Sequence, residues 1–457
     1  MGAAIGIFGL GVMGRSLALQ LAEKGVAVAA YDPWTEARAE AAAAGVPGIA
    51  ATPEAFAASL EKPGTVLLMV KAGEPVDDAI ARLSALLPAG ALLADGGNSH
   101  FRDSERRAAA LAARGIGFLG IGISGGETGA RHGASIMTGG DAAGFERISP
   151  LLRQVAALAG GKPCLAHFGS AGAGHFAKMV HNAIEYAEMQ LIAETVFLLR
   201  TAARAAWPEI AASAAQWNRG LGACYLLEIT AEILRARDRG TGLPIMEIVV
   251  GRAEQKGTGR WAATEALELG VPVPTLIEAV EARSLSALRE PSAPDALAAA
   301  PVAAAPPPPQ ELGEALLAAR IAVYDQGFAL LRAAAEPHGI TGDLAELAEI
   351  WRAGCIIRGA LLDPIAAALR AGPSRLLLAP GLREAVTPRL QAWRRTAASA
   401  TSLGVPVPAL ASALAYYDGL RAEHSSASLL QLQRDTFGAH GFERVDRKGR
   451  FHIDRAE

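Results

Sequence analysis

The first 32 residues contain a glycine pattern that few folds accommodate. Residues 3–8 read as a short buried strand, and the run Gly9-Leu10-Gly11-Val12-Met13-Gly14 follows directly, before a helical pattern that ends at Gly25. A second apolar strand then ends at Asp32. Glycines at this spacing let the backbone approach a pyrophosphate, whose charge the helix N-terminus favours. The pattern therefore predicts a dinucleotide-binding α/β domain of the Rossmann type, the alternative being a turn that needs glycine only for packing.

The end of the second strand also bears on the choice of cofactor. A carboxylate at Asp32 would accept hydrogen bonds from a ribose 2′-hydroxyl and would repel a 2′-phosphate. Pro33 and Trp34 follow it, and neither is an arginine. We therefore expect NAD to be preferred, with NADP possible.

Further strand patterns extend the sheet. Residues 65–73 should form a strand that ends beside the cofactor, and residues 91–100 another that ends near Asn98. Because the carboxyl ends of parallel strands form the ligand crevice, Asn98 should meet the substrate next to the nicotinamide. The alternative is ordinary turn chemistry. The residues expected beside the cofactor at the end of the first of these strands are Val70, Lys71 and Ala72.

The segment 115–140 contains two strand patterns around Ser124, Gly125 and Gly126. Backbone N–H groups of such a Ser-Gly-Gly sequence could bind a carboxylate as a nest. We expect this loop at the same crevice, next to the nicotinamide, although a turn without a ligand would have the same composition.

Residues 172–194 plot as a helix with two unlike faces. One face is apolar, and the other carries Lys178, His181, Asn182, Glu185 and Tyr186. Solvated helix faces favour Lys/Glu pairs, whereas this one offers five different functional groups. The rise from Lys178 to Glu185 is roughly 10 Å. An extended six-carbon acid could therefore lie along this face with a different group over each end.

Helical periodicity dominates from residue 172 to about 425, and this half contains an internal repeat. The sequence LGVPVP occurs at 269–274 and again at 403–408, which suggests a duplicated helical unit. A Pro/Ala-rich segment at 291–309 separates the copies and is expected to be extended. We expect a Rossmann-type domain at 1–171, a large all-helical substrate and dimerisation domain at 172–425, and a C-terminal tail at 426–457.

Composition excludes several classes of function. A net charge of −3 gives no general reason to expect nucleic acid or an anionic membrane as a partner. The three cysteines are scattered, which suits a reducing cytoplasm without disulfides. The chain begins at once with a strand pattern, so no signal peptide is expected, and no apolar run is long enough to span a bilayer.

The chain resembles the 6-phosphogluconate dehydrogenase (decarboxylating) family over essentially its whole length. The matching runs are GLGVMG, VKAG, DGGNSHFRDSERR, GISGGETGARHGASIMTGG, GAGHFAKMVHNAIEY, EQKGTGRW, WRAGCIIR and QRDTFGAH. The resemblance implies oxidation of C3 of 6-phosphogluconate, loss of CO2 without a metal, and protonation to ribulose 5-phosphate, a reaction of the pentose phosphate pathway. It implies an obligate homodimer.

The resemblance also implies roles for single residues. Lys178 would be the base at the C3 hydroxyl and the acid during decarboxylation, and Glu185 would protonate C1. Asn98 would bridge cofactor and substrate. The carboxylate and hydroxyl end of the substrate would be held by Ser124, Gly125, Gly126, His181 and Asn182. The phosphate would be held by Tyr186, Lys256 and Arg283, with Arg434 and His440 supplied by the tail of the other subunit.

Departures from the family pattern concern the cofactor and the tail. Asp32-Pro33-Trp34 replaces the usual Asn-Arg-Thr, which removes the arginine that would meet a 2′-phosphate. In the tail, SSASL replaces a usual LPANL, although Arg434 and His440 are retained. Two alternatives stay open: a 3-hydroxyacid dehydrogenase of the same superfamily that does not decarboxylate, and a catalytically silent nucleotide-binding protein, which should have lost Lys178 or Glu185.

Overall fold

The N-terminal half is built on a seven-stranded sheet with the order β2-β1-β3-β4-β5-β6-β9. The computed structural model describes residues 2–255, 257–288 and 305–453. The first five strands are parallel, β6 is antiparallel to β5, and β9 is parallel to β6. A short hairpin of β7 and β8 lies outside the sheet. The strands are β1 Ile5–Phe8, β2 Val28–Tyr31, β3 Thr65–Leu68, β4 Leu92–Asp95, β5 Gly117–Ser124, β6 Ser135–Gly140, β7 Leu158–Ala159, β8 Lys162–Pro163 and β9 Leu165–His167.

Helices cover both faces of this sheet, as a doubly wound fold requires. One apolar core joins the sheet to α1, α6 and α7, and a second joins its other face to α3 and α4. The strands are continuous apolar runs because both faces are buried. The helices are α1 Val12–Glu23, α2 Thr35–Ala43, α3 Pro53–Ser59, α4 Glu74–Leu86, α5 Phe101–Ala112, α6 Gly126–His132 and α7 Ala142–Val155. The Rossmann-type domain predicted from the glycine pattern is confirmed.

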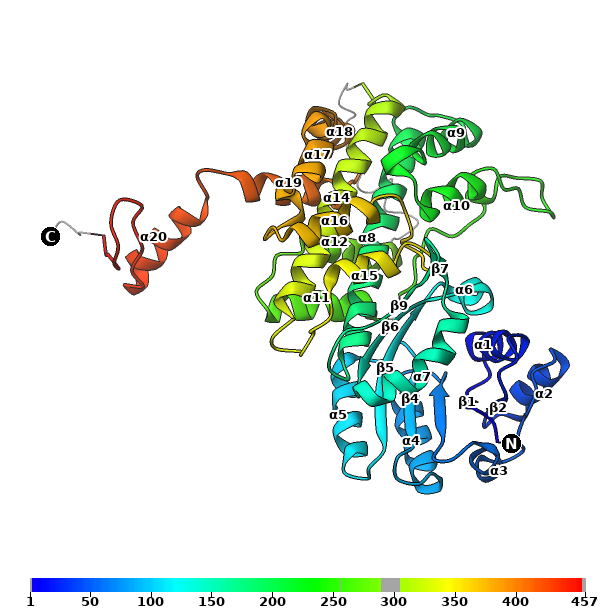
Figure 1. Ribbon diagram of the computed structural model, residues 1–457. Helices are drawn as coiled ribbons and strands as arrows, with labels where there is room; N and C mark the ends of the chain where they lie inside the picture. Colours follow the sequence, from blue (N-terminus) through cyan, green and yellow to red (C-terminus); the bar gives the residue numbers. More distant parts are fainter. Residues whose placement is uncertain (1, 256, 289–304, 454–457) are drawn as a thin grey trace.

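The second half is helical, and its two long helices, α8 and α14, pack against each other at its centre (Figure 1). A Cβ added to Gly327 of α14 would lie 2.5 Å from Ile184 Cδ1 of α8, so the two backbones approach closely there. The α-helices are α8 Ala173–Thr201, α9 Trp207–Trp217, α10 Tyr225–Ile233, α11 Thr258–Glu268, α12 Pro274–Leu288, α14 Pro309–Ala333, α15 Leu344–Ile350, α16 Leu362–Ala371, α17 Pro380–Val386, α18 Leu390–Ser402, α19 Pro408–Arg421 and α20 Ala427–Gly438, and the 3-10 turns are η1 Gly220–Gly222, η2 Ile245–Glu247, η3 Leu376–Leu378 and η4 Thr387–Arg389.

The expected duplication is visible in the positions of these helices. Helix α12 begins at Pro274 and α19 begins 134 residues later, at Pro408. The two copies also cap each other. Glu194 on α8 accepts hydrogen bonds of 2.9 Å from the backbone N–H groups of Ala409 and Leu410 at the start of α19. Gln326 on α14 accepts one of 2.9 Å from Thr275 N at the start of α12. Each central helix therefore stabilises the first turn of a helix in the other copy.

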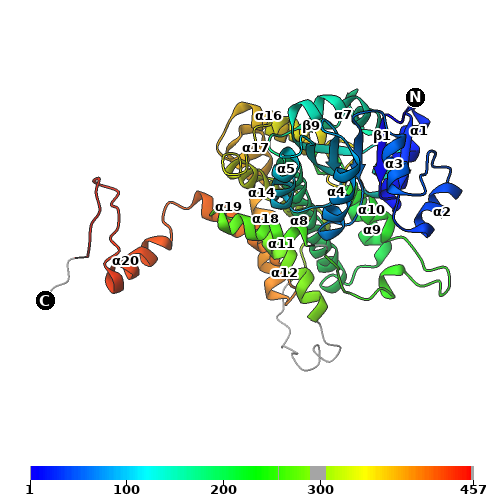
Figure 2. The ribbon, with the colours of Figure 1, turned by 90° about the horizontal axis from the view of Figure 1, so that it is seen from below.

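The C-terminal part projects from the body of the molecule. Figures 1 and 2 show α20 and the segment after it extending beyond the helical bundle. Within this tail, Asp435 accepts backbone hydrogen bonds from Gly441 and Ile453, and Phe442 pairs with Phe451. Most of the Pro/Ala-rich segment expected to be extended lies outside the described residues. None of the described helices combines the length and the hydropathy needed to cross a bilayer.

Replacement of Glu194 should weaken the joint between the two helical copies. Glu194→Ala leaves two buried N–H groups of α19 without acceptors, so we expect the free energy of unfolding to fall by about 2 kcal/mol. Urea unfolding followed by circular dichroism measures this change. Glu232→Ala, on the exposed side of α10, is the control and should change stability little. Equal stability of the two variants would contradict the capping role.

Candidate active site

Three adjoining cavities run from the glycine turn to the polar face of α8. The nucleotide cavity, about 480 Å³, is lined by Gly9, Gly11, Asp32 and Trp34. The central cavity, about 700 Å³, shares Met69, Val70 and Lys71 with it. The polar cavity, about 430 Å³, shares Met13, Asn98 and Ile123 with the central one. Together they form a continuous path along the carboxyl ends of β1 to β5, where ligands bind to sheets of this kind.

The glycine turn has the geometry that a bound pyrophosphate requires. A Cβ on Gly11, which precedes α1, would have no neighbour within 4 Å, so the backbone there is open to a ligand. Gly9 has a φ of +106°, and a Cβ on Gly14 would lie 1.9 Å from Gly9 O, so these two glycines serve the turn and its packing. Leu10 is buried in the core, and Val12 does not line the cavities. The side chains of these two predicted residues therefore do not line the described cavities.

The carboxylate of Asp32 holds the turn between β2 and α2. It accepts hydrogen bonds from Leu10 N at 2.7 Å and Trp34 N at 2.9 Å. One bond reaches each oxygen, so lone pairs remain for ribose hydroxyls. Arg38, which the sequence argument did not consider, donates to the main-chain oxygen of Asp32 at 2.6 Å and to Thr35 Oγ1. A cation therefore does lie next to this turn, although it is four residues beyond Trp34.

Asn98 and the Ser124–Gly126 loop meet at the polar cavity, as predicted from their strand ends. Asn98 follows β4, is exposed, and lines both the central and the polar cavity. Ser124 ends β5. Gly125 precedes α6 with a φ of +114°, so the residues between β5 and β6 form a short helix that the sequence analysis did not anticipate. Ser124, Gly125 and Gly126 all line the polar cavity, at the start of α6.

Helix α8 brings Lys178, Asn182, Glu185 and Tyr186 to the same cavity. The position of Lys178 follows from the close packing of α8 on β5, because a Cβ on Gly122 would lie 2.4 Å from Lys178 Cβ. His181 differs from the prediction. It is fully buried behind the cavity wall, where Nε2 lies 3.1 Å from Ser124 Oγ and Nδ1 lies 3.2 Å from Asn182 Oδ1. The imidazole therefore contacts two residues that line the polar cavity.

Burial sets the charge of the groups that line this cavity. It lowers the pKa of the Lys178 amine from its usual range, and the carboxylate of Glu185 only partly opposes this effect. Burial raises the pKa of Glu185, against the opposing charges of Lys178 and Arg283. Burial and the nearby Lys178 hold the pKa of His181 well below its usual value, so that its imidazole is neutral. Burial thus shifts the amine towards its neutral form and the carboxyl group towards its protonated form, which suits proton transfer at two points.

At the far end of the polar cavity, an arginine stacks on an aromatic ring. The Arg283 guanidinium lies 3.6 Å from the centroid of the Tyr186 ring and donates to Glu254 O. Lys256, predicted beside it, lies outside the described residues. Sequence reasoning missed several other lining residues, among them Met189, Glu254 and Ile356, because nothing in their local sequence distinguishes them from packing residues.

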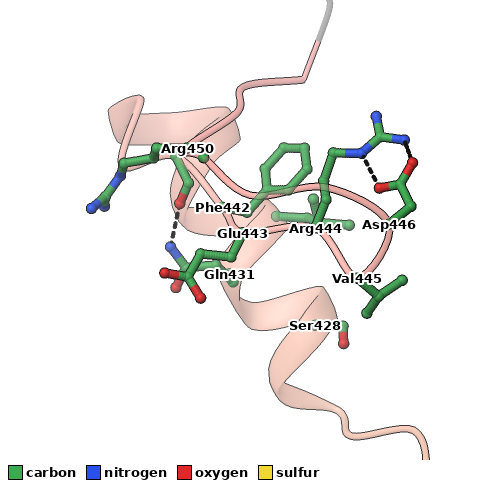
Figure 3. Close-up of a pocket in the computed structure, with 11 residues that line it drawn as sticks. Ser428, Gln431, Phe442, Glu443, Arg444, Val445, Asp446 and Arg450 are labelled. Atoms are coloured by element: carbon green, nitrogen blue, oxygen red, sulfur yellow. Dashed lines mark hydrogen bonds and ion pairs between the residues drawn. The ribbon is translucent and has the colours of Figure 1, made fainter.

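Arg434 and His440 are not brought to this cavity by their own chain. Both lie on the projecting tail, where Arg434 Nη1 donates to Gln431 Oε1. The tail has a hollow of its own between α20 and the loop that follows (Figure 3). Gln431 donates to Gly441 O and Arg444 pairs with Asp446 there. This hollow shares no lining residue with the polar cavity.

Comparison with known proteins places the whole chain in one family. Residues 4–169 match the family model described as the NAD binding domain of 6-phosphogluconate dehydrogenase, and residues 174–455 match that described as its C-terminal domain. The chain is 43% identical to the NAD(+)-dependent decarboxylating 6-phosphogluconate dehydrogenase of Bacillus subtilis, covering 99% of both chains. It is 42% identical to the NADP(+)-dependent enzyme of the same organism, covering 98% of both.

A solved structure agrees with these relatives over the same length. The chain superposes on 6-phosphogluconate dehydrogenase of Plasmodium falciparum, studied in its apo form and with NADP+ and 6-phosphogluconate, with a TM-score of 0.93 at 33% identity. The match covers 98% of this chain and 99% of that one. Both halves and their arrangement are therefore shared.

Proposed function

This chain belongs to the 6-phosphogluconate dehydrogenase family, and we propose that it converts 6-phosphogluconate to ribulose 5-phosphate and CO2 with NAD as the preferred electron acceptor. The observation that carries the proposal is the polar cavity, in which a buried amine and a partly buried carboxyl group face one space next to the nucleotide path. We place the reaction in cytoplasmic sugar-phosphate metabolism, with the chain divided at 171/172 and 425/426.

The first chemical step requires a base at the C3 hydroxyl, and we assign this role to Lys178. The bound cofactor supplies hydride acceptance. Because burial lowers its pKa, the amine of Lys178 is available in neutral form to take the hydroxyl proton. The resulting ammonium can donate to the C3 carbonyl oxygen, which lies β to the carboxylate. Electron withdrawal at that oxygen lets CO2 leave and forms an enediol.

We assign protonation of C1 to Glu185. It lies on the same face of α8 as Lys178, two turns further along, and burial raises its pKa, which favours the protonated form that can donate. We assign the carboxylate end of the substrate to Asn182 and the Ser124–Gly126 loop, held in place by His181. Tyr186, Arg283 and Lys256 would bind the phosphate.

We propose a homodimer in which the tail of each subunit completes the other's site. Arg434 and His440 would then reach the phosphate from the partner. The projection of α20 from its own body supports this assignment (Figures 1 and 2). Leu429, Leu430 and Phe437 on α20 are more than half exposed in the single chain, and a second copy would cover them.

A non-decarboxylating 3-hydroxyacid dehydrogenase is the weaker alternative. An enzyme of that kind would need neither the second helical copy nor the arginine at the end of the polar cavity. The relatives reported above match the full chain, second copy included. The presence of both Lys178 and Glu185 in one cavity likewise argues against a catalytically silent protein.

Loss of the amine at position 178 should abolish turnover. We expect Lys178→Ala to reduce kcat by at least about a thousandfold while the dissociation constant for NAD stays near that of the wild type, because the nucleotide cavity is unchanged. NADH formation at 340 nm and equilibrium binding measure the two quantities. In the wild type, kcat/KM should rise with pH as Lys178 loses its proton, with a midpoint below 10.5. Unchanged turnover of the variant would contradict the assignment.

Cofactor preference should depend on the charge at position 32. The relatives include both NAD- and NADP-dependent enzymes at similar identity, so the proposal rests on Asp32 itself. We expect Asp32→Gly with Pro33→Arg to shift the ratio of kcat/KM for NAD over NADP by at least about tenfold towards NADP. The double substitution removes the carboxylate that would bind a ribose 2′-hydroxyl and adds a guanidinium that can bind a 2′-phosphate. Initial rates with both cofactors measure the shift. Glu36→Gln, an exposed charge change nearby, is the control; an unaltered ratio in the double variant would refute the argument.

Removal of the tail should weaken substrate binding. Deleting residues 426–457 removes two of the groups assigned to the phosphate, so we expect the KM for 6-phosphogluconate to rise at least about tenfold with a smaller change in the KM for NAD. In the full-length chain, Arg434→Ala should reproduce much of this effect, whereas Arg447→Ala, a control on the same tail, should not. Steady-state kinetics test both. A fully active truncated enzyme would rule out a shared site.

A further inference from the structure

A buried arginine beneath the cavities contacts both loops that carry cofactor-lining residues. Arg107, on α5, is 2% exposed and does not line any of the three cavities. Its Nη2 donates to Gly73 O at 3.0 Å, and its Nη1 donates to Asp95 Oδ2 and Ser99 Oγ, each at 3.2 Å. Its Nε donates to Asp77 Oδ1 at 2.9 Å. One planar group thus joins the segment after β3 to the turn after β4.

The turn after β4 is closed around the same carboxylate. Asp95, the last residue of β4, accepts from Gly97 N at 3.0 Å and from Ser99 Oγ at 2.6 Å. Asn98 lies between these two contacts and lines both the central and the polar cavity. The position of Asn98 is therefore determined by Asp95, whose charge is balanced by Arg107.

The segment after β3 depends on the same guanidinium. Residues 70–73 line the central cavity, and Gly73, which precedes α4 with a φ of +92°, gives its carbonyl oxygen to Arg107. The separation between this segment and Asn98 is thus set by the rigid fork of one side chain. A lysine has a single charged nitrogen on a flexible stem and cannot reproduce these directed bonds.

Stability alone does not account for this arrangement. Arg106, the next residue, pairs with the same Asp77 at 3.0 Å while its side chain is 57% exposed. In contrast, the ion pair of Arg107 with Asp95 is almost fully buried, and such pairs contribute little net stability relative to apolar groups of the same size. What the buried pair supplies is fixed geometry.

We propose that Arg107 is a positioning residue that sets the distance between the two cofactor-lining loops and thereby aligns the nicotinamide and the substrate over Lys178. This inference rests on the proposed function. Arg107 acts through Asn98 and residues 70–73 and does not touch the reacting atoms. Its loss should therefore affect the chemical step more than the affinity for either ligand, because a displacement of about 1 Å can cost a hundredfold in rate.

The test compares Arg107→Lys with Arg106→Lys, two substitutions of the same kind at adjacent positions. We expect Arg107→Lys to lower kcat at least about tenfold, with the dissociation constant for NAD within about threefold of the wild type. The kinetic isotope effect on kcat with C3-deuterated 6-phosphogluconate should increase, because hydride transfer becomes slower than product release. Arg106→Lys should keep wild-type kcat and isotope effect.

Several outcomes would overturn the proposal. A kcat for Arg107→Lys within twofold of the wild type would do so, and so would a loss of activity matched by an equal loss of NAD affinity with an unchanged isotope effect. If Arg107→Lys does not fold, Ser99→Ala decides the question. It removes one hydroxyl from the cluster, and it should lower kcat and raise the isotope effect in the same sense; wild-type values would refute the role. Turnover of 6-phosphogluconate by the wild type tests the proposed function separately.

Discussion

The close contact between helix α8 and strands β5 and β6 is the constraint on which the site depends. Gly122 faces Lys178 with no space for a side chain, and a Cβ on Gly174 would lie 2.3 Å from Gly120 O. Helix α8 therefore lies directly on the sheet, and the side chain of Lys178 is buried from water. Exclusion of water is what lowers the pKa of the amine and raises that of Glu185. The pKa shifts of Lys178 and Glu185 therefore depend on how closely α8 packs on the sheet.

Much of this arrangement could be predicted from the sequence because the signals are local. The glycine pattern, the strand ends at Asn98 and Ser124, and the helical register of Lys178, Asn182 and Glu185 each lie within a few residues, and the structure brings them to adjoining cavities. The register could not show that His181, although on the same face, is buried against Ser124. The burial of His181 depends on its contact with β5, whose Ser124 lies 57 residues earlier in the sequence.

The residues that sequence reasoning missed have partners on other elements. Arg38 of α2 donates to the main-chain oxygen of Asp32 after β2, and Arg107 of α5 reaches Gly73 before α4 and Asp95 at the end of β4. Each reads as an ordinary surface arginine in the sequence. Strand lengths were also overestimated, since β3 ends at Leu68 and the apolar residues after it form the cavity wall. Apolar composition alone does not separate a strand from the lining of a cavity next to it.

The reciprocal capping of the two helical copies has a consequence for how the chain acquires its structure. The first turn of α12 depends on Gln326, which is synthesised later, and the first turn of α19 depends on Glu194, which is synthesised much earlier. An emerging first copy therefore lacks an acceptor that only the second copy can provide. The two halves of the helical region thus complete each other, and we expect them to fold together once the last helix has left the ribosome.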